Sequence, residues 1–582
     1  MLKFYSPIED TLTYYARRYF RFIFAALSLL AVVYIFDAEY SSNDLPFKSI
    51  IHGTQNIHEV QLFHAISSIR PLPTALTREP KKIEHVPEQI PATVAALDEK
   101  HRRMIKATFE KSWKSYHQRA WLQDELKPVS GSSKNTTGGW ATTLINTLDT
   151  LWIMDLKKEF REAVHVIKDL DWAATTVQSC SMSKVATQQL GGLLSAYDLS
   201  KDSVLLAKAI ELGEILYTGF DTENHMPVSE LHFENASTGR LSLNEQQSSA
   251  QALGLSLEFT RLTQLTGNNK YYDAIARVAD VMYQNQNYTK LPGLWPVSVD
   301  LQNNVFNHDN VFTLGASSGL MYQSILNMHT LLSGGDPIYQ DMYIQAAETI
   351  IRTLFFRPMT HKQNLDILFT GTFHVGNEPP LESVLQHQAC FVGGMFALGG
   401  RVFDNAHHVD LGATLTNSCI WAYNMFPTGI MPEVSQMVRC PNLDRCKWEE
   451  QKWFDAVLND YDGRDDLPKG FHSARDPSYS LRHEAVESVF MLYRITGHEE
   501  YREHAYRMFE AVQNATETQH ANAAIQDVTV HSNKPTHADS MDSLWLSATL
   551  KYLYLTFSPQ DQISLDEFVF NSAGHPLRIP KR

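Results

Sequence analysis

From about residue 98 onward, apolar positions recur with the three-and-four spacing of amphipathic helices. Three stretches share one pattern, in which a helical run ends at a glycine and a tyrosine four residues later opens the next run. They are 262–271, 331–339 and 493–501. Glycine takes the left-handed conformation that closes a helix, so we predict helix ends at Gly267, Gly335 and Gly497. Each tyrosine is expected to pack back on the preceding helix.

Further helix pairs without this turn are predicted at 141–170 and 190–217. Repeated helix pairs are typical of an α-solenoid or of a closed α/α barrel. Long, irregular loops at 220–245, 285–313 and 357–388 favour an all-α barrel that carries a site on its loop face. Short strands are expected in those loops.

The N-terminus carries a hydrophobic run at 22–36, with Arg17, Arg18 and Arg21 before it and acidic residues after it. A cleaved signal peptide is one interpretation, but no small-x-small cleavage site follows the run. We therefore predict a cytosolic tail at 1–21, a signal-anchor transmembrane helix at 22–36 and a proline-rich stem at 37–97. The positive flank stays in the cytosol, which makes this a type II membrane protein of the endoplasmic reticulum or Golgi with its bulk in the lumen.

Net charge, glycosylation sequons and cysteines agree with a globular domain in the secretory pathway. The net charge is −15 and no extended Lys/Arg stripe follows residue 120, so nucleic acid is excluded as a partner. Glycosylation sequons begin at Asn135, Asn235, Asn287 and Asn514. Five cysteines, whose spacing matches no zinc pattern, would allow two disulfides and one free thiol in an oxidising lumen.

The run 478–488 holds the densest candidate chemistry. Arg482, Glu484 and Glu487 lie within six residues, and the two glutamates share one helix face. Two carboxylates beside an arginine suit a polar pocket in which one group handles a proton and the others hold a substrate. A solvated helix face with an ion pair is the alternative interpretation.

An ordered series of motifs resembles glycoside hydrolase family 47, the class I α-1,2-mannosidases, over residues 98–580. The motifs are Trp140–Met154, Leu190–Tyr197, Cys390–Gly399, Thr428–Glu433, Leu481–Ser488, Thr549–Leu555 and Phe570–Pro576. The resemblance implies an (α/α)7 barrel that trims α-1,2-linked mannose from N-glycans, with high-mannose glycan or glycoprotein as partner and a monomeric state. It also implies a calcium ion at the barrel floor and a disulfide between Cys390 and Cys419, while Cys440 and Cys446 could form a local bridge.

The same resemblance implies that several acidic or charged positions of the family are replaced in this chain. The replaced positions are Lys184, Gln188, Gln251, Gln323, Gln386, Ala548 and Ala573. Lys184 stands where a family carboxylate belongs, and Gln386 stands at another catalytic-site carboxylate. Ser572 stands at the calcium-binding threonine, where it keeps a hydroxyl and a carbonyl.

The retained positions are Glu484 as candidate base, with Arg482, Glu487 and Glu433 as candidate substrate-binding residues. Inverting hydrolysis needs a carboxylic acid opposite such a base, and an amide cannot act as one. We therefore predict a mannosidase-like protein with impaired standard hydrolysis and a weakened calcium site.

Three alternatives stay open. The protein could be a glycan-binding or scaffolding pseudoenzyme, or a glycosidase in which His387, His483 or Lys184 takes a new role. It could also be an ordinary mannosidase, if Glu245 or Glu378 reaches the position of the missing acid. The segment 407–410 could bind a metal, but a polar loop is the favoured interpretation because no third ligand follows at a suitable spacing.

Overall fold

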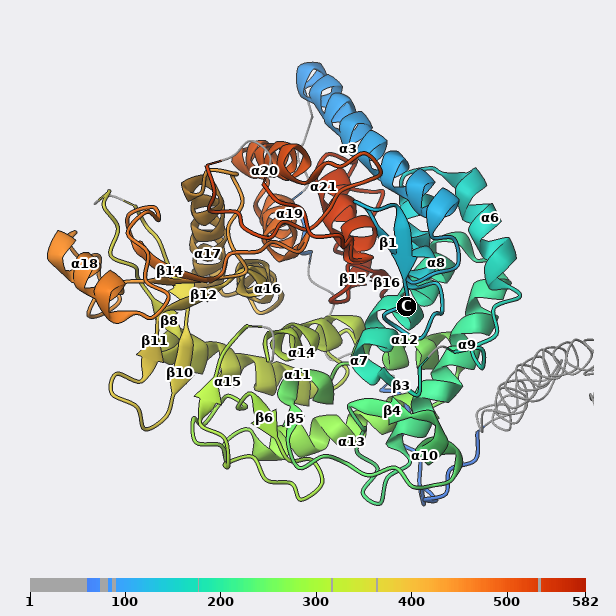
Figure 1. The fold of residues 1–582 in the computed structure, drawn as a ribbon. Coiled ribbons are helices and arrows are strands. Elements are labelled where there is room, and N and C mark those ends of the chain that lie inside the picture. The colour runs from blue at the N-terminus through green and yellow to red at the C-terminus, as the bar shows by residue number, and fades with distance from the viewer. Residues whose placement is uncertain are drawn as a thin grey trace, which may run out of the picture. The chain divides into compact units, whose positions relative to one another are not determined.

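Helices in two concentric rings form the body of the protein (Figure 1). The computed structural model describes residues 60–73, 82–85, 91–175, 177–315, 318–362, 365–531 and 535–581. All of them belong to one unit of the chain, Ile57–Arg582. The predicted tail and anchor lie outside the described residues, and within those residues no helix is long and apolar enough to cross a bilayer.

The helices alternate between an outer and an inner ring along the chain. The outer helices are α3 (Ala92–Arg119), α6 (Lys157–Ile167), α9 (Ser203–Tyr217), α13 (Lys270–Asn285), α15 (Pro337–Thr353), α17 (Ala406–Met425) and α20 (Glu500–Thr516). The inner helices are α5 (Leu148–Ile153), α8 (Gly191–Ser200), α12 (Ser256–Thr266), α14 (Gly319–Leu331), α16 (Phe391–Val402), α19 (Glu484–Thr496) and α21 (Leu550–Thr556). Each inner helix contacts the next, and the π-helix η4 (Trp545–Thr549), which continues into α21, contacts α5 and closes the ring. The described residues therefore form the predicted (α/α)7 barrel.

Shorter helices decorate the rings, and all paired strands are antiparallel. The remaining helices are α4 (Thr142–Asn146), α7 (Met182–Val185), η1 (Ala186–Leu190), η2 (Thr218–Phe220), α10 (Phe233–Ser237), α11 (Ser249–Ala252), η3 (His387–Cys390) and α18 (Glu450–Asn459). The two-stranded pairs are β1–β2 (Glu125–Lys127, Ser132–Lys134), β3–β4 (Ser179–Ser181, Glu230–His232), β5–β6 (Gln247–Ser248, Ser298–Val299), β8–β9 (Phe355–Phe356, Phe369–Thr370) and β15–β16 (Phe568–Phe570, Pro576–Arg578). The three-stranded sheets are β11–β10–β7 (Leu381–Glu382, Thr372–His374, Val311–Phe312) and β12–β13–β14 (Val384–Gln386, Val434–Met437, Phe471–Asp476). Strands thus occur in each of the three predicted long loops.

Two inner helices, α16 and α19, are buried on all sides over most of their length. Every residue of 391–400 on α16 is buried, and so is every residue of 484–495 on α19. Gly393 and Gly412 let α16 and α17 approach closely, because a Cβ on Gly393 would lie 2.2 Å from Thr416 Oγ1. The predicted disulfide Cys390–Cys419 joins the end of η3, immediately before α16, to α17.

The predicted glycine helix ends are confirmed at two of three positions. Gly267 and Gly497 are left-handed C-caps with φ of 75° and 72°. In the third stretch α14 ends at Leu331, and the left-handed glycine is Gly334 rather than Gly335, because Ser333 also takes a positive φ and lengthens the turn. The three tyrosines, Tyr271, Tyr339 and Tyr501, are buried at the starts of α13, α15 and α20.

Part of the predicted stem lies against the barrel. The backbone N–H groups of Phe63 and His64 donate to Asp221, and the backbone N–H of Arg70 donates to Asp273. Further on, the buried Glu84 lies 3.5 Å from the guanidinium of Arg494, which is fully buried on α19. Residues 60–73 and 82–85 therefore act as a strap along the barrel. The first barrel helix begins at Ala92, six residues before the predicted boundary.

Candidate functional site

A cavity of about 340 Å³ lies between α7–η1, α11, α14 and the turn that joins β15 to β16. It is lined by Ser183, Lys184, Thr187, Gln188, Ser248, Ala250, Gln251, Gly254, Leu320, Ser324, Leu544, Ser572 and Ala573. Five of the positions singled out in the sequence therefore come together from three distant segments. Gln386 and Glu484 are not among the described lining residues, and the replacement of family residues stays a prediction.

The lining of the cavity carries one charged side chain and no carboxylate. The charged group is Lys184, which is half-buried and makes no ion pair with any described residue. The other polar lining groups are hydroxyls and the amides of Gln188 and Gln251. The amide oxygen of Gln188 is buried with no hydrogen-bond partner among the described residues. An unmet buried acceptor costs about 1–3 kcal/mol, which a ligand with hydroxyl groups would recover.

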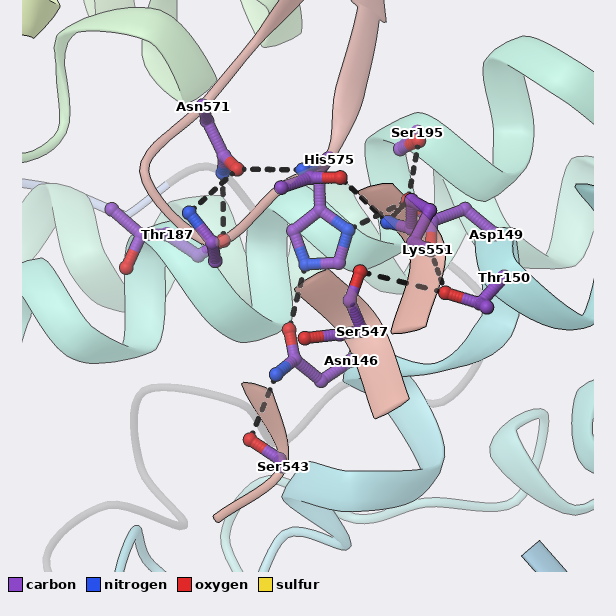
Figure 2. A network of polar contacts seen from close by, with 12 residues as sticks. Asn146, Asp149, Thr150, Thr187, Ser195, Ser543, Ser547, Lys551, Asn571 and His575 are labelled. Carbon is purple, nitrogen blue, oxygen red and sulfur yellow. Dashed lines mark hydrogen bonds and ion pairs between the residues drawn. The ribbon is translucent and has the colours of Figure 1, made fainter. Parts of the chain in front are cut away.

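The turn β15–β16, residues 571–575, forms one wall of the cavity and is held by a buried polar network (Figure 2). Asn571 organises the turn itself, because its Oδ1 accepts from the backbone N–H of Ala573 and of His575 (3.0 and 2.9 Å). Its Nδ2 donates to the Thr187 carbonyl (2.8 Å) and so joins the turn to the π-helix η1. This network sets the positions of Ser572, Ala573 and Gln188 around the cavity.

Asp149 anchors the other side of the same network. Its Oδ2 accepts from Lys551 Nζ and His575 Nδ1 (2.7 Å each) and from Ser195 Oγ (2.9 Å), and Figure 2 shows the His575 ring between Asp149 and Asn146. Lys551 also donates to the Gly574 carbonyl (2.6 Å). Burial would raise the pKa of Asp149, but Lys551 and His575 lower that pKa to about 2.

Glu258 is a further buried carboxylate at this turn. Its Oε1 accepts from Asn571 Nδ2 (2.7 Å), and burial raises the pKa of Glu258 to about 7. The sequence analysis assigned no role to Glu258, Asn571, Asp149, Lys551 or His575. Asp149, Lys551, Asn571 and His575 lie inside the quoted motifs, but their roles could be seen only when these distant segments met around one turn.

The retained candidate residues form a second cluster at the start of α19. Arg482 Nε donates to Glu433 Oε2 (2.7 Å), and Arg482 Nη1 lies 3.6 Å from Glu484 Oε1. Burial opposes the charge of Arg482, but Glu484 and Glu433 raise its pKa above the ordinary value. The arginine thus holds both carboxylates, and Glu433, Arg482 and Glu484 come together as the sequence predicted.

Glu484 faces a histidine on its other side. His387 Nδ1 lies 3.8 Å from Glu484 Oε2, and its Nε2 is 2.7 Å from the Tyr423 hydroxyl. Burial lowers the pKa of His387 to about 4, so the imidazole is neutral near pH 7. Glu484 Oε2 is buried with no hydrogen-bond partner among the described residues. Its negative charge is therefore balanced chiefly by Arg482.

Glu487 keeps its proton near neutral pH. Burial and the nearby Glu484 raise the pKa of Glu487 to about 8, although Gln323 Nε2 donates to its Oε1 (2.5 Å). His483 Nε2 lies 3.8 Å from Glu487 Oε2, and the Ser572 carbonyl is among the groups that favour the protonated His483 ring. His483 therefore links the Glu487 cluster to the turn β15–β16.

The remaining replaced positions are not in the cavity lining. Gln386 packs over Gly315, where a Cβ would lie 2.0 Å from its Oε1. Ala548 is fully buried in η4 and packs beneath Gly574. Glu245 and Glu378, the alternative acids, are exposed and do not line the cavity. Among the described lining residues, no carboxyl group takes the place of the acid that the family resemblance implies.

The residues present do not fit the calcium ion that the family resemblance implies. Calcium needs six to eight oxygen ligands, usually with several carboxylates. Ser572 lies in the cavity wall beside Lys184, whose charge repels a cation, and the lining includes no carboxylate. Across the described part of the chain, no group of three or more His, Cys, Asp or Glu side chains is placed to hold a metal. The segment His407–Asp410 forms no metal site either, and it lies in the first turns of α17 rather than in the expected loop.

The cysteines pair as expected within the described residues. Cys390–Cys419 and Cys440–Cys446 are disulfides, and Cys180 is a buried free thiol. Asn135, Asn287 and Asn514 are exposed and Asn235 is half-buried, so their glycosylation stays a prediction.

Comparisons with known proteins agree on one family. The model of glycosyl hydrolase family 47 matches residues 108–579. The chain is 31% identical over 518 residues to a Homo sapiens endoplasmic reticulum mannosyl-oligosaccharide 1,2-alpha-mannosidase, covering 87% of this chain and 68% of that protein. It is 28% identical to a mannosyl-oligosaccharide alpha-1,2-mannosidase of Coccidioides posadasii over 85% of this chain and 94% of that protein. The solved alpha-1,2-mannosidase of Trichoderma reesei superposes with a TM-score of 0.74 at 27% identity, covering 83% of this chain and 99% of that one.

Proposed function

We propose that this chain, which belongs to glycosyl hydrolase family 47, binds mannose-containing glycans in its barrel cavity but has lost the standard calcium-dependent hydrolysis. The observation that carries the proposal is the cavity lining, which includes Lys184 and no carboxylate. Its hydroxyls and amides are the groups that bind sugar hydroxyls in proteins. The natural ligand would be a high-mannose N-glycan or a glycoprotein that carries one.

The loss of hydrolysis follows from the chemistry of the reaction. Inversion requires a carboxylic acid on the leaving oxygen and a carboxylate that activates water on the opposite face. Glu484 could still polarise a water, but Arg482 balances its charge and no carboxyl group lines the cavity to act opposite it. Binding energy without the acid holds a glycan in place and leaves the glycosidic bond intact.

A second candidate function is a glycosidase with altered catalytic groups. It is favoured by Glu487, whose pKa of about 8 keeps a carboxylic acid protonated beside Glu484. A protonated carboxyl group can act as the acid of a glycosidase, with a neighbouring carboxyl group as the base. Against this candidate, neither glutamate is among the residues that line the cavity.

The cellular setting is part of the same proposal. A signal anchor at 22–36 would hold the barrel in the lumen of the endoplasmic reticulum or Golgi, where high-mannose glycans occur. The exposed sequon asparagines and the two disulfides support a secretory route. We further propose that the protein acts as a monomer.

The deciding experiment incubates the purified full-length chain with a high-mannose N-glycan, with and without calcium, and measures both released mannose and glycan bound. We expect binding with no released mannose. Glu484→Gln and Glu487→Gln serve as matched variants, because each removes one retained carboxyl group and keeps the shape. Calcium-dependent release that disappears in Glu484→Gln overturns the proposal. Calcium-independent release that disappears in Glu487→Gln establishes the second candidate instead.

A further inference from the structure

We propose that the cavity selects a sugar that carries an anionic group, with Lys184 as the partner of the anion. The anionic group would be a phosphate, a sulfate or a carboxylate, which share the oxygen acceptors that an ammonium group binds. This inference rests on the proposed function, since it concerns the same cavity, and it adds the charge of the ligand.

The charges around the cavity point to an anionic ligand. Lys184 is the one charged residue among the described lining, and no described carboxylate pairs with it. Glu433 and Glu484, which belong to the second cluster, both contact Arg482. In a protein of net charge −15, an unpaired cation in a recess favours a ligand that carries negative charge.

Two helix starts add to the positive potential of the cavity. The helical stretch α7–η1–α8 runs without a break over 182–200, and Ser183 and Lys184 lie in its first turn. The first two turns of α14 contribute Leu320 and Ser324 to the lining. The N-terminal end of a helix carries partial positive charge and unpaired N–H groups, which favour anions.

The other polar groups of the lining, which are hydroxyls and amides, suit a ligand with several hydroxyl groups rather than a simple anion. The buried amide oxygen of Gln188, a residue of the lining, has no hydrogen-bond partner among the described residues. An amide oxygen accepts from hydroxyl groups, of which a sugar carries several, hydrogen phosphate one and sulfate none. The lining hydroxyls of Ser572 and Ser324 can donate or accept. An anionic sugar satisfies both the ammonium group and the amide.

The experiment measures dissociation constants of the full-length chain by calorimetry for mannose, mannose 6-phosphate, mannose 6-sulfate, mannuronic acid, inorganic phosphate and α-1,2-mannobiose. A charged hydrogen bond in a recess corresponds to a preference of about tenfold or more for the anionic sugars over mannose. The preference should shrink as salt rises, because salt screens the ion pair. Inorganic phosphate should bind more weakly than mannose 6-phosphate, since it lacks the ring hydroxyls that the other polar groups of the lining would bind.

Variants of one residue isolate the role of the ammonium group. Lys184→Met should abolish the preference for anionic sugars over mannose, whereas Lys184→Arg should retain it. Lys452→Met removes an exposed lysine on α18 and serves as the control for total charge. Equal constants for mannose and all three anionic sugars overturn the inference, as does a preference that persists in Lys184→Met.

The outcomes separate this inference from the proposed function. Binding of α-1,2-mannobiose without any preference for anionic sugars refutes the inference and leaves the proposed function standing. A Lys184-dependent preference for anionic sugars without α-1,2-mannobiose binding supports the inference and refutes neutral mannose chains as the ligand. Absence of binding to every probe overturns both.

Discussion

Replacing Asp149 by asparagine tests whether the buried network holds the barrel together. Asp149, Lys551 and His575 are all fully buried, and Asp149 accepts hydrogen bonds from both of the other side chains. The pKa of Asp149 falls from 3.8 to about 2, and a difference of about 2 units corresponds to about 2.5 kcal/mol that favours the ionised form. Asparagine loses this stabilisation and leaves the Lys551 charge unpaired. We therefore expect the free energy of unfolding to fall by about 3–5 kcal/mol in all.

The assay is thermal unfolding followed by calorimetry at pH 7. The unfolding entropy of a domain this large is about 1 kcal/mol/K, so the expected loss lowers Tm by about 3–5 °C. Asp466→Asn, which removes an exposed carboxylate beside Arg464, is the control and should change Tm by less than about 1 °C. Lys551→Met added to Asp149→Asn removes the stranded charge and should recover about half of the loss.

The pH dependence has a definite sign. The pKa of Asp149 is depressed in the folded state, so its contribution is complete above pH 3.8 and is lost as pH falls toward 2. The Tm difference between wild type and Asp149→Asn should therefore shrink between pH 4 and pH 2. A single variant with the Tm of wild type, or a double variant no more stable than the single one, would refute the reasoning.

Three further variants test other parts of the structure by the same calorimetry. The pKa of Glu487 is raised to about 8, so the folded chain binds this proton more tightly than the unfolded chain and loses stability as pH rises from 4.5 to 8. Glu487→Gln should therefore flatten the dependence of Tm on pH in this range. Parallel Tm profiles for wild type and variant would contradict this expectation. Glu84→Gln strands the fully buried Arg494 and should cost about 3 kcal/mol if residues 82–85 are part of the fold, whereas a spacer would tolerate it. Gly412→Val places a Cβ 2.6 Å from the Gly393 carbonyl and should cost about 1–3 kcal/mol, and an unchanged Tm would mean that α16 and α17 can separate.

The helical frame was predictable because it depends on local patterns. Glycine helix ends such as Gly267 and buried tyrosines such as Tyr271 follow from backbone conformation and apolar spacing within one repeat. The turn near Gly335 shows the limit, since a positive φ at Ser333 moved the left-handed glycine to Gly334. The strap formed by part of the predicted stem was not visible either, because proline-rich sequence looks like a spacer until its N–H groups find carboxylates such as Asp221.

The residue identities at the site came from the sequence, and their grouping came from the tertiary structure. The motif register predicted that Lys184, Gln251 and Ala573 replace family residues, and that Glu484 and Arg482 remain. Only the folded barrel divided these positions between a cavity without carboxylates and a separate, buried carboxylate cluster. Charge and burial act through space over a few ångströms, whereas the contributing segments lie hundreds of residues apart along the chain. The sequence by itself therefore determined where helices form and predicted which family residues are replaced. Closure of the ring decided which charged side chains lie next to one another.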